Sequence, residues 1–201
     1  QPSLDDPRRS VTENTMAECI STTYRRWQIR LHWLTLVLLM IVYGTIGLRG
    51  LAVRGSWQGK MVIMTHFSCG VLVFAVICLR LLLRLRYPAP PPLSLARQWQ
   101  HRLSSAVHQL LYLLFLSLPV MGVASRYLRG QPWPLFGILM PVTTRPDPGL
   151  SRQIIRWHET LADAGYWLIG LHALAAIIHH FLLRDNTLRR MLPSRRVPPH
   201  P

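Results

Sequence analysis

The chain has 201 residues, half of them hydrophobic, and a formal net charge of +15 at pH 7. Its mean hydropathy is nevertheless positive, at +0.21. This combination excludes an ordinary soluble domain, in which charge is dispersed and apolar runs are short. The basic residues lie between apolar segments instead of forming a patch on a soluble surface, so we expect no nucleic acid among the partners.

Four apolar segments are each long enough, or nearly so, to cross about 30 Å of hydrocarbon. The first three contain no Asp, Glu, Lys or Arg, and the fourth contains one acid, Asp163. The sequence therefore predicts an all-α integral membrane protein, a four-helix bundle in the lipid bilayer. The segments are Leu31–Leu48, Met61–Leu79, Leu103–Ser125 and Leu161–Leu183.

We expect residues 1–22 to be a disordered N-terminal extension, 23–196 to be one transmembrane domain, and 197–201 to be a short tail. The predicted helices run over Tyr24–Leu48, from about Gly59 to Arg86, over Leu103–Tyr127, and from Ser151, as N-cap, to Leu183. The stretch Trp133–Met140 between the last two helices is apolar. It either anchors to the membrane interface or covers a cofactor on that side.

The charge distribution predicts the orientation. Four spans place both termini and the second loop on one side, which carries fifteen basic residues against eight on the other. The positive-inside rule therefore predicts a multi-pass protein of the bacterial inner (plasma) membrane, with both termini cytoplasmic. Only Asp147, Glu159 and Asp163 oppose the eight basic residues outside, so that side is also positive. It would attract small anions or contact lipid headgroups, and composition favours neither.

Histidines in the apolar segments are the most informative residues. His158 and His172 lie fourteen residues apart in one predicted helix, so both project from one face, about 21 Å apart along the axis. His32 and His66 lie singly in two other segments. Because an imidazole in a membrane is costly unless something binds it, this pattern predicts two cofactor sites at two depths.

Depth can be counted from the charged residues at the outer side, at about 1.5 Å per residue. His32 and His172 then lie about 25 and 24 Å inward, whereas His66 and His158 lie only about 9 and 3 Å inward. The count thus predicts a deep pair and a shallow pair. His108 in the third helix, about 27 Å inward, is an equally deep alternative that spacing does not exclude.

Haem is the cofactor that two imidazoles per site fit best. Structural zinc takes four protein ligands, and iron–sulfur clusters take groups of cysteines, whereas porphyrin itself supplies four nitrogens to iron. The three cysteines show no Cys-x-x-Cys-His, so the haem is expected to be of b type. His179 and His180, near the inner surface, could bind a quinone headgroup or be interfacial, and we favour a quinone role for His179.

Several motifs together resemble those of the bacterial cytochrome b561 family, over about Tyr24 to Arg196. Within that family they are most similar to the superoxide:ubiquinone oxidoreductases. The motifs are Ile29-Arg30-Leu31-His32-Trp33, His66-Phe67-Ser68-Cys69-Gly70, the arginine-rich run from Arg80 to Pro88, Arg129-Gly-Gln-Pro132-Trp133, Trp157-His158-Glu159-Thr160-Leu161 and Gly170-Leu171-His172. Arg30 departs from the pattern, because those oxidoreductases have a small polar residue there.

The resemblance implies two b haems, with axial pairs His32–His172 for the inner iron and His66–His158 for the outer iron, and so demotes His108. It also implies that superoxide is oxidised to dioxygen at the periplasmic side and that ubiquinone is reduced, with His179 lining the quinone site.

For such an enzyme, superoxide would be attracted by Arg126, Arg129 and Arg152. With both axial positions filled, electrons would pass through the haem edge. The alternative is a non-catalytic electron-transfer cytochrome b subunit that serves a partner dehydrogenase. A homo-oligomer is compatible with either.

Overall fold

A computed structural model of the chain describes residues 26–51, 53, 55–87 and 98–182. Four long helices make up most of this part: α2 (Arg26–Arg49), α3 (Trp57–Arg86), α4 (Gln98–Arg129) and α5 (Pro148–Phe181). Each is long and apolar enough to cross a membrane. The described part therefore has the four predicted spans, within a few residues of the predicted bounds.

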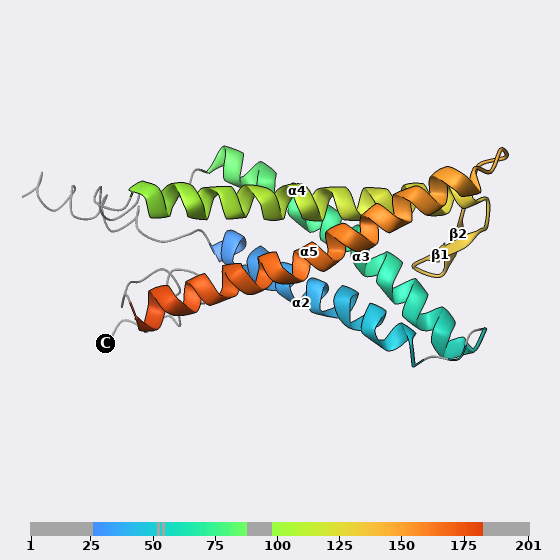
Figure 1. The fold of residues 1–201 in the computed structure, drawn as a ribbon, viewed down its shortest axis with the longest axis horizontal. Coiled ribbons are helices and arrows are strands. Elements are labelled where there is room, and N and C mark those ends of the chain that lie inside the picture. Colours follow the sequence, from blue (N-terminus) through green and yellow to red (C-terminus); the bar gives the residue numbers. More distant parts are fainter. Residues whose placement is uncertain (1–25, 52, 54, 88–97, 183–201) are drawn as a thin grey trace, which may run out of the picture.

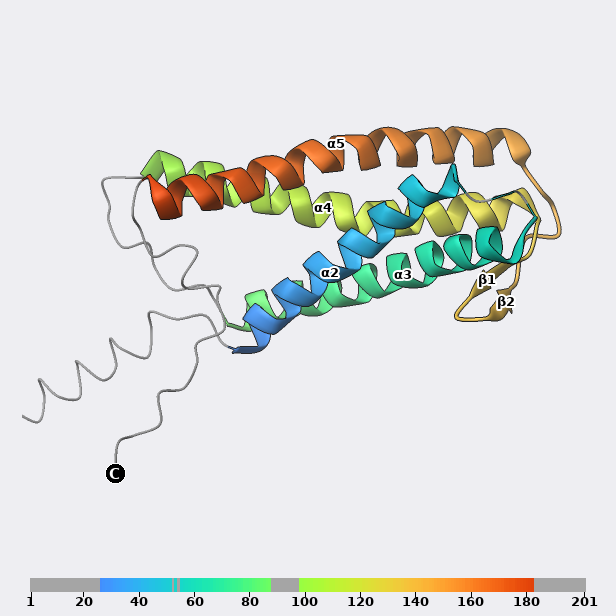
Figure 2. The ribbon, with the colours of Figure 1, turned by 90° about the horizontal axis from the view of Figure 1, so that it is seen from below.

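The helices form two pairs. The contacts between α2 and α3 and between α4 and α5 are extensive, α3 also touches α4, and α5 has little backbone contact with α2 or α3. Figure 2 shows α4 with α5 above and α2 with α3 below, and Figure 1 shows the same helices crossing at an angle. The four histidines predicted to form the two pairs lie between α5 on one side and α2 and α3 on the other.

The buried core occupies the middle of the bundle and joins three helices. It consists of branched aliphatic side chains and one Phe, as expected for helices that pack by interlocking side chains. Its members are Leu38, Leu39, Val73, Ile77, Leu114, Phe115 and Leu118.

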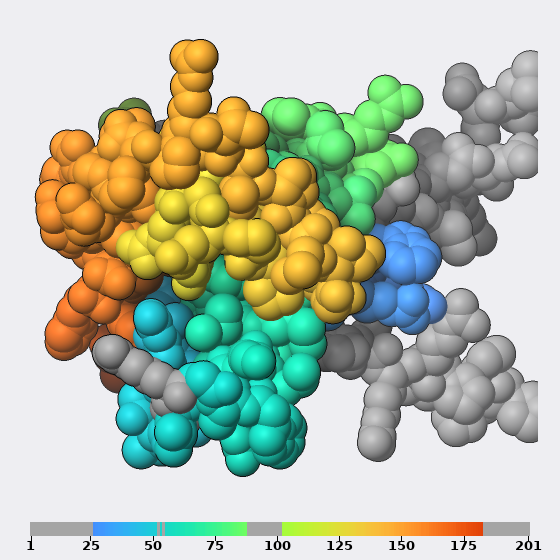
Figure 3. All heavy atoms as spheres, turned by 90° about the vertical axis from the view of Figure 1, so that its right-hand side faces the viewer, coloured from blue at the N-terminus to red at the C-terminus, as the bar shows by residue number. Residues whose placement is uncertain are grey.

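A two-stranded hairpin, β1 (Trp133–Leu135) and β2 (Ile138–Met140), follows α4. Phe136 and Gly137 form the turn, with φ angles of 49° and 84°. Positive φ at both central residues matches the twist of a two-residue hairpin, and the Phe is unusual there. The Phe136 amide donates to Ser68 Oγ at 2.9 Å, which fastens the hairpin to α3. Figure 3 views this end of the bundle, the hairpin end, where the hairpin lies beside α3.

The start of the last helix differs from the prediction. Its N-cap is Asp147, whose carboxylate accepts from the Leu150 amide at 2.9 Å, and Pro148 occupies the first turn. Ser151 is instead fully buried and exchanges hydrogen bonds with Ser125 of α4. Ser151 was therefore wrong as the N-cap, because Asp147, four residues earlier and followed by Pro148, provides a better first turn.

Some predictions lie outside the described residues. These are the disordered extension over 1–22 and the tail over 197–201.

Candidate functional site

His66 of α3 and His158 of α5 face each other near the hairpin end, with ring centroids 6.5 Å apart. Each Nδ1 lies within hydrogen-bond distance of a backbone carbonyl of a neighbouring helix. His66 Nδ1 is 3.1 Å from Val42 O, and His158 Nδ1 is 2.9 Å from Leu118 O. A proton on Nδ1 donates to that carbonyl and leaves Nε2 with a lone pair. A hydrogen bond from the ring nitrogen that does not bind the metal is the usual way in which proteins orient metal-binding imidazoles.

A cavity between the helices joins these two rings. Its walls are mainly aliphatic, and Gly70 keeps one side open because no atom lies within 4 Å of where its Cβ would be. Charged groups of both signs complete the wall. They are Arg49, Arg126, Glu159 and Asp163.

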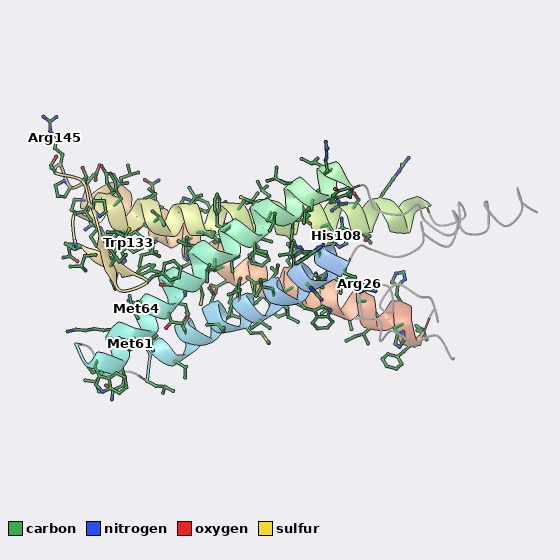
Figure 4. All side chains as sticks on the ribbon, turned by 180° about the vertical axis from the view of Figure 1, so that it is seen from behind. Arg26, Met61, Met64, His108, Trp133 and Arg145 are labelled. Carbon is green, nitrogen blue, oxygen red and sulfur yellow. The ribbon has the colours of Figure 1, made fainter. Side chains whose placement is uncertain are left out.

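A second pair lies deeper in the bundle. The His32 ring of α2 and the His172 ring of α5 have centroids 6.3 Å apart. His108 of α4 also packs on His172, with ring centroids 5.1 Å apart, and its Nδ1 lies 2.6 Å from Ser104 O. Figure 4 labels His108 well away from Arg145 and Trp133, toward the other end of the bundle, so this level is the one remote from the hairpin.

Both predicted pairs have the separation that one shared iron requires. An imidazole nitrogen binds a transition metal at about 2 Å, and the ring centre lies about 1 Å beyond, so two rings on opposite sides of one metal have centroids roughly 6 Å apart. The pairs His66–His158 and His32–His172 match this value. His108–His172, at 5.1 Å, is shorter and fits direct ring packing.

The described residues contain no group of three or more His, Cys, Asp or Glu side chains that could hold a bare metal ion. Two imidazoles per level are sufficient only for a metal that brings its own equatorial ligands, as haem iron does. The donor set at each level is of the kind that a b-type haem takes, and at the His66–His158 level the mainly apolar cavity also fits one.

The His32 ring is held differently from His66 and His158. Its Nδ1 lies 3.2 Å from Nη2 of Arg80, whose other terminal nitrogen donates to Thr35 Oγ1 at 3.1 Å. A guanidinium only donates hydrogen bonds, so His32 Nδ1 accepts here. From the sequence, Arg80 was counted among the cytoplasmic charges and in the arginine-rich family motif, and neither predicted this contact.

The other predicted residues are dispersed. Arg126 lines the cavity and lies over the Phe67 ring, with its guanidinium carbon 5.1 Å from the ring centroid. Arg129 ends α4, and Arg152 is exposed in the first turns of α5; neither lines the cavity. His179 lies in the last turn of α5, far along the helix from the cavity. Arg49, which the sequence analysis did not single out, does line it.

Comparison with known proteins shows the family of the chain. A family model described as prokaryotic cytochrome b561 matches residues 23–194. The chain belongs to the prokaryotic cytochrome b561 family. It is 43% identical to a protein of Yersinia pestis named probable superoxide oxidase CybB, over 86% of this chain and 97% of that protein. Two proteins of Escherichia coli K12, named cytochrome b561 homolog 1 and homolog 2, are 36% and 31% identical, over 86% and 80% of this chain and 98% and 86% of those proteins.

Membership establishes the general activity. This cytochrome b561 is a membrane electron-transfer protein of the oxidoreductase type, it binds b-type haem, and it is a multi-pass protein of the bacterial inner membrane.

Proposed function

We propose that this cytochrome b561 oxidises superoxide at the hairpin end, which faces the periplasm, and delivers the electrons to ubiquinone through two bis-histidine haems. The haems supply one-electron redox chemistry when bound, and the protein supplies their position, burial and access. Similarity to the protein named probable superoxide oxidase supports this substrate.

The observation that carries the proposal is the wall of the cavity at the hairpin end. Arg49 and Arg126 line the same cavity as His66 and His158. Two guanidinium groups in a low-dielectric wall attract a small anion more strongly than the same groups would in water. Glu159 and Asp163 of α5 also line the cavity and partly offset this attraction, so the positive charges of the lining come from α2 and α4.

The four histidines would bind the haem irons. His66 and His158 would ligate the iron nearer the hairpin, and His32 and His172 the iron of the other level. The carbonyls of Val42 and Leu118 fix the first two rings and keep each Nε2 unprotonated. The quinone would be reduced near the end of α5 that carries His179, where an imidazole can donate a hydrogen bond to a quinone oxygen.

The test is rapid mixing of the oxidised, haem-loaded protein with superoxide, followed by the absorbance of reduced b haem. We expect fast reduction that slows as ionic strength rises, because salt screens the attraction between charges. R126Q should slow the second-order reduction several-fold and weaken the salt dependence. R145Q, which removes an equal charge from the exposed loop before α5, is the matched control.

The alternative, an electron-transfer subunit that serves a dehydrogenase, predicts a different result. Haem would be present, but superoxide would reduce it slowly at low and high salt alike. That result would overturn the superoxide assignment and leave the family assignment intact.

A further inference from the structure

Arg80 is a charged side chain in the membrane-spanning helix α3, six residues before the helix ends. Its described partners are the Thr35 hydroxyl, the His32 ring nitrogen and the face of Tyr112, whose centroid is 5.8 Å from the guanidinium carbon. None of these is an anion. A buried or half-buried cation in a membrane is costly without a counter-charge, so an anionic group is expected beside Arg80.

Arg84, one turn along α3, adds a second cation to the same place. Its guanidinium carbon also lies 5.8 Å from the centroid of Tyr112. The carboxylates of the described residues are Asp147, Glu159 and Asp163, and even Asp163 precedes His172 by nine residues, or about 14 Å of helix. Two positive charges thus lie beside the His32–His172 pair with no carboxylate of the described chain at their level.

The contact with His32 adds a second argument. Because Arg80 donates to Nδ1, the neutral His32 ring carries its proton on Nε2. Iron needs that same Nε2 unprotonated. The hydrogen bond from Arg80 and ligation of iron by His32 are therefore incompatible on one neutral ring, and an anionic partner that turns the guanidinium away resolves the conflict.

From this we infer that Arg80, supported by Arg84, is the binding site for the propionate carboxylates of the haem held by His32 and His172. A b haem carries two such carboxylates, which matches the two guanidinium groups, and an Arg–carboxylate pair is strong because two N–H groups can donate in parallel. The inference rests on the proposed haem at this level. Arg80 is a positioning residue, since it acts on the propionates and on the orientation of His32.

The experiment compares R80Q with the parent protein, both purified with their haems, by redox titration of the b bands and by resonance Raman spectroscopy of the propionate modes. An unpaired propionate stabilises ferric over ferrous haem, so one of the two midpoints should fall. We expect a change of about tenfold in the reduced-to-oxidised ratio, or about 59 mV for one electron. The propionate band of the same haem should move, and the other haem should keep its midpoint.

Three further variants make the result decisive. R80K keeps the charge and should recover most of the midpoint, T35V should give a smaller fall in the same direction, and R145Q should give none. If R80Q is poorly produced, T35V carries the test: an unchanged midpoint and an unchanged propionate band in T35V would overturn the inference.

Two further experiments distinguish the haem propionates from other anions that could neutralise Arg80. If a lipid phosphate is the counter-ion, the parent protein in nanodiscs without anionic lipid should show the R80Q midpoint. If Asp185, which lies outside the described residues, is the counter-ion, D185N should reproduce it. Either result would overturn the inference. Absence of a second haem in the parent protein would instead contradict the proposed function.

Discussion

His32, His66 and His158 are each oriented by what contacts Nδ1, and those contacts come from residues far away in the sequence. Val42 precedes His66 by twenty-four residues, and Leu118 precedes His158 by forty. Gly122 of α4 also lies beside His158, since an added Cβ would sit 3.5 Å from the ring, in ordinary van der Waals contact. Ring orientation is therefore a property of helix packing as much as of the histidines themselves.

The pairing predicts which haem each substitution removes. H158A should lose the haem nearer the hairpin and H172A the haem of the other level, because one remaining imidazole holds a haem poorly. The pyridine haemochrome assay should give about half the parent haem content for each variant. The two variants should retain different b bands in reduced-minus-oxidised spectra.

H108A is the matched control for these variants. His108 packs on His172 with the shorter spacing, so its loss should leave both haems in place. Loss of the same haem from H158A and H172A, or loss of a haem from H108A, would contradict the pairing.

At the scale of the elements, α2 and α5 approach closely at one point between the two histidine levels. Tyr43 Oη donates to Ala162 O at 3.0 Å, and its ring packs on Tyr166 with centroids 4.2 Å apart. Gly165 is buried beneath the Tyr43 hydroxyl, so an added Cβ would clash with that oxygen. This contact sets the separation of α2 from α5, and thereby the space available at both levels.

G165A should therefore destabilise the protein by about 1–3 kcal/mol, the usual cost of overpacking. It would lower the midpoint of thermal unfolding in detergent. G170A is the matched control on the same helix, since nothing lies within 4 Å of its added Cβ, and it should be neutral or slightly stabilising. Y43F should recover part of the loss in a G165A background. Equal behaviour of the two alanine variants would show that helix propensity, and not the Tyr43 contact, controls stability here.

The hairpin is the element that sequence reasoning missed. Its stretch was predicted to be an interfacial apolar segment, either an anchor or a cap. Trp133 is only 4% exposed and packs on Phe67, with ring centroids 5.1 Å apart, and Phe67 in turn lines the cavity. The hairpin is therefore held against a residue of the cavity wall. The turn was not predictable because it places Phe136, instead of a Gly or Asn, at positive φ.

At the scale of the whole molecule, the spans and the spacing of His158 and His172 follow directly from sequence. Apolar length and the 3.6-residue helical period depend only on local order in the chain. The environment of His32 does not, since Arg80 lies forty-eight residues away and joins it only once α2 packs on α3. Charge counting placed Arg80 among the residues that select orientation, and helix packing shows that it also belongs to the site.

Orientation is the remaining property of the whole molecule, and it can be measured by labelling cysteines in a C69A/C78A background, which leaves Cys19 as the native thiol. Arg145 is exposed in the loop before α5, at the hairpin end (Figure 4), so R145C presents a thiol on the side predicted to be periplasmic. A membrane-impermeant maleimide should label R145C in intact cells. Cys19, on the predicted cytoplasmic side, should react in the C69A/C78A chain only after the inner membrane is permeabilised. Labelling of Cys19 but not R145C in intact cells would invert the topology and place the Arg126 cavity in the cytoplasm, where it could not meet periplasmic superoxide.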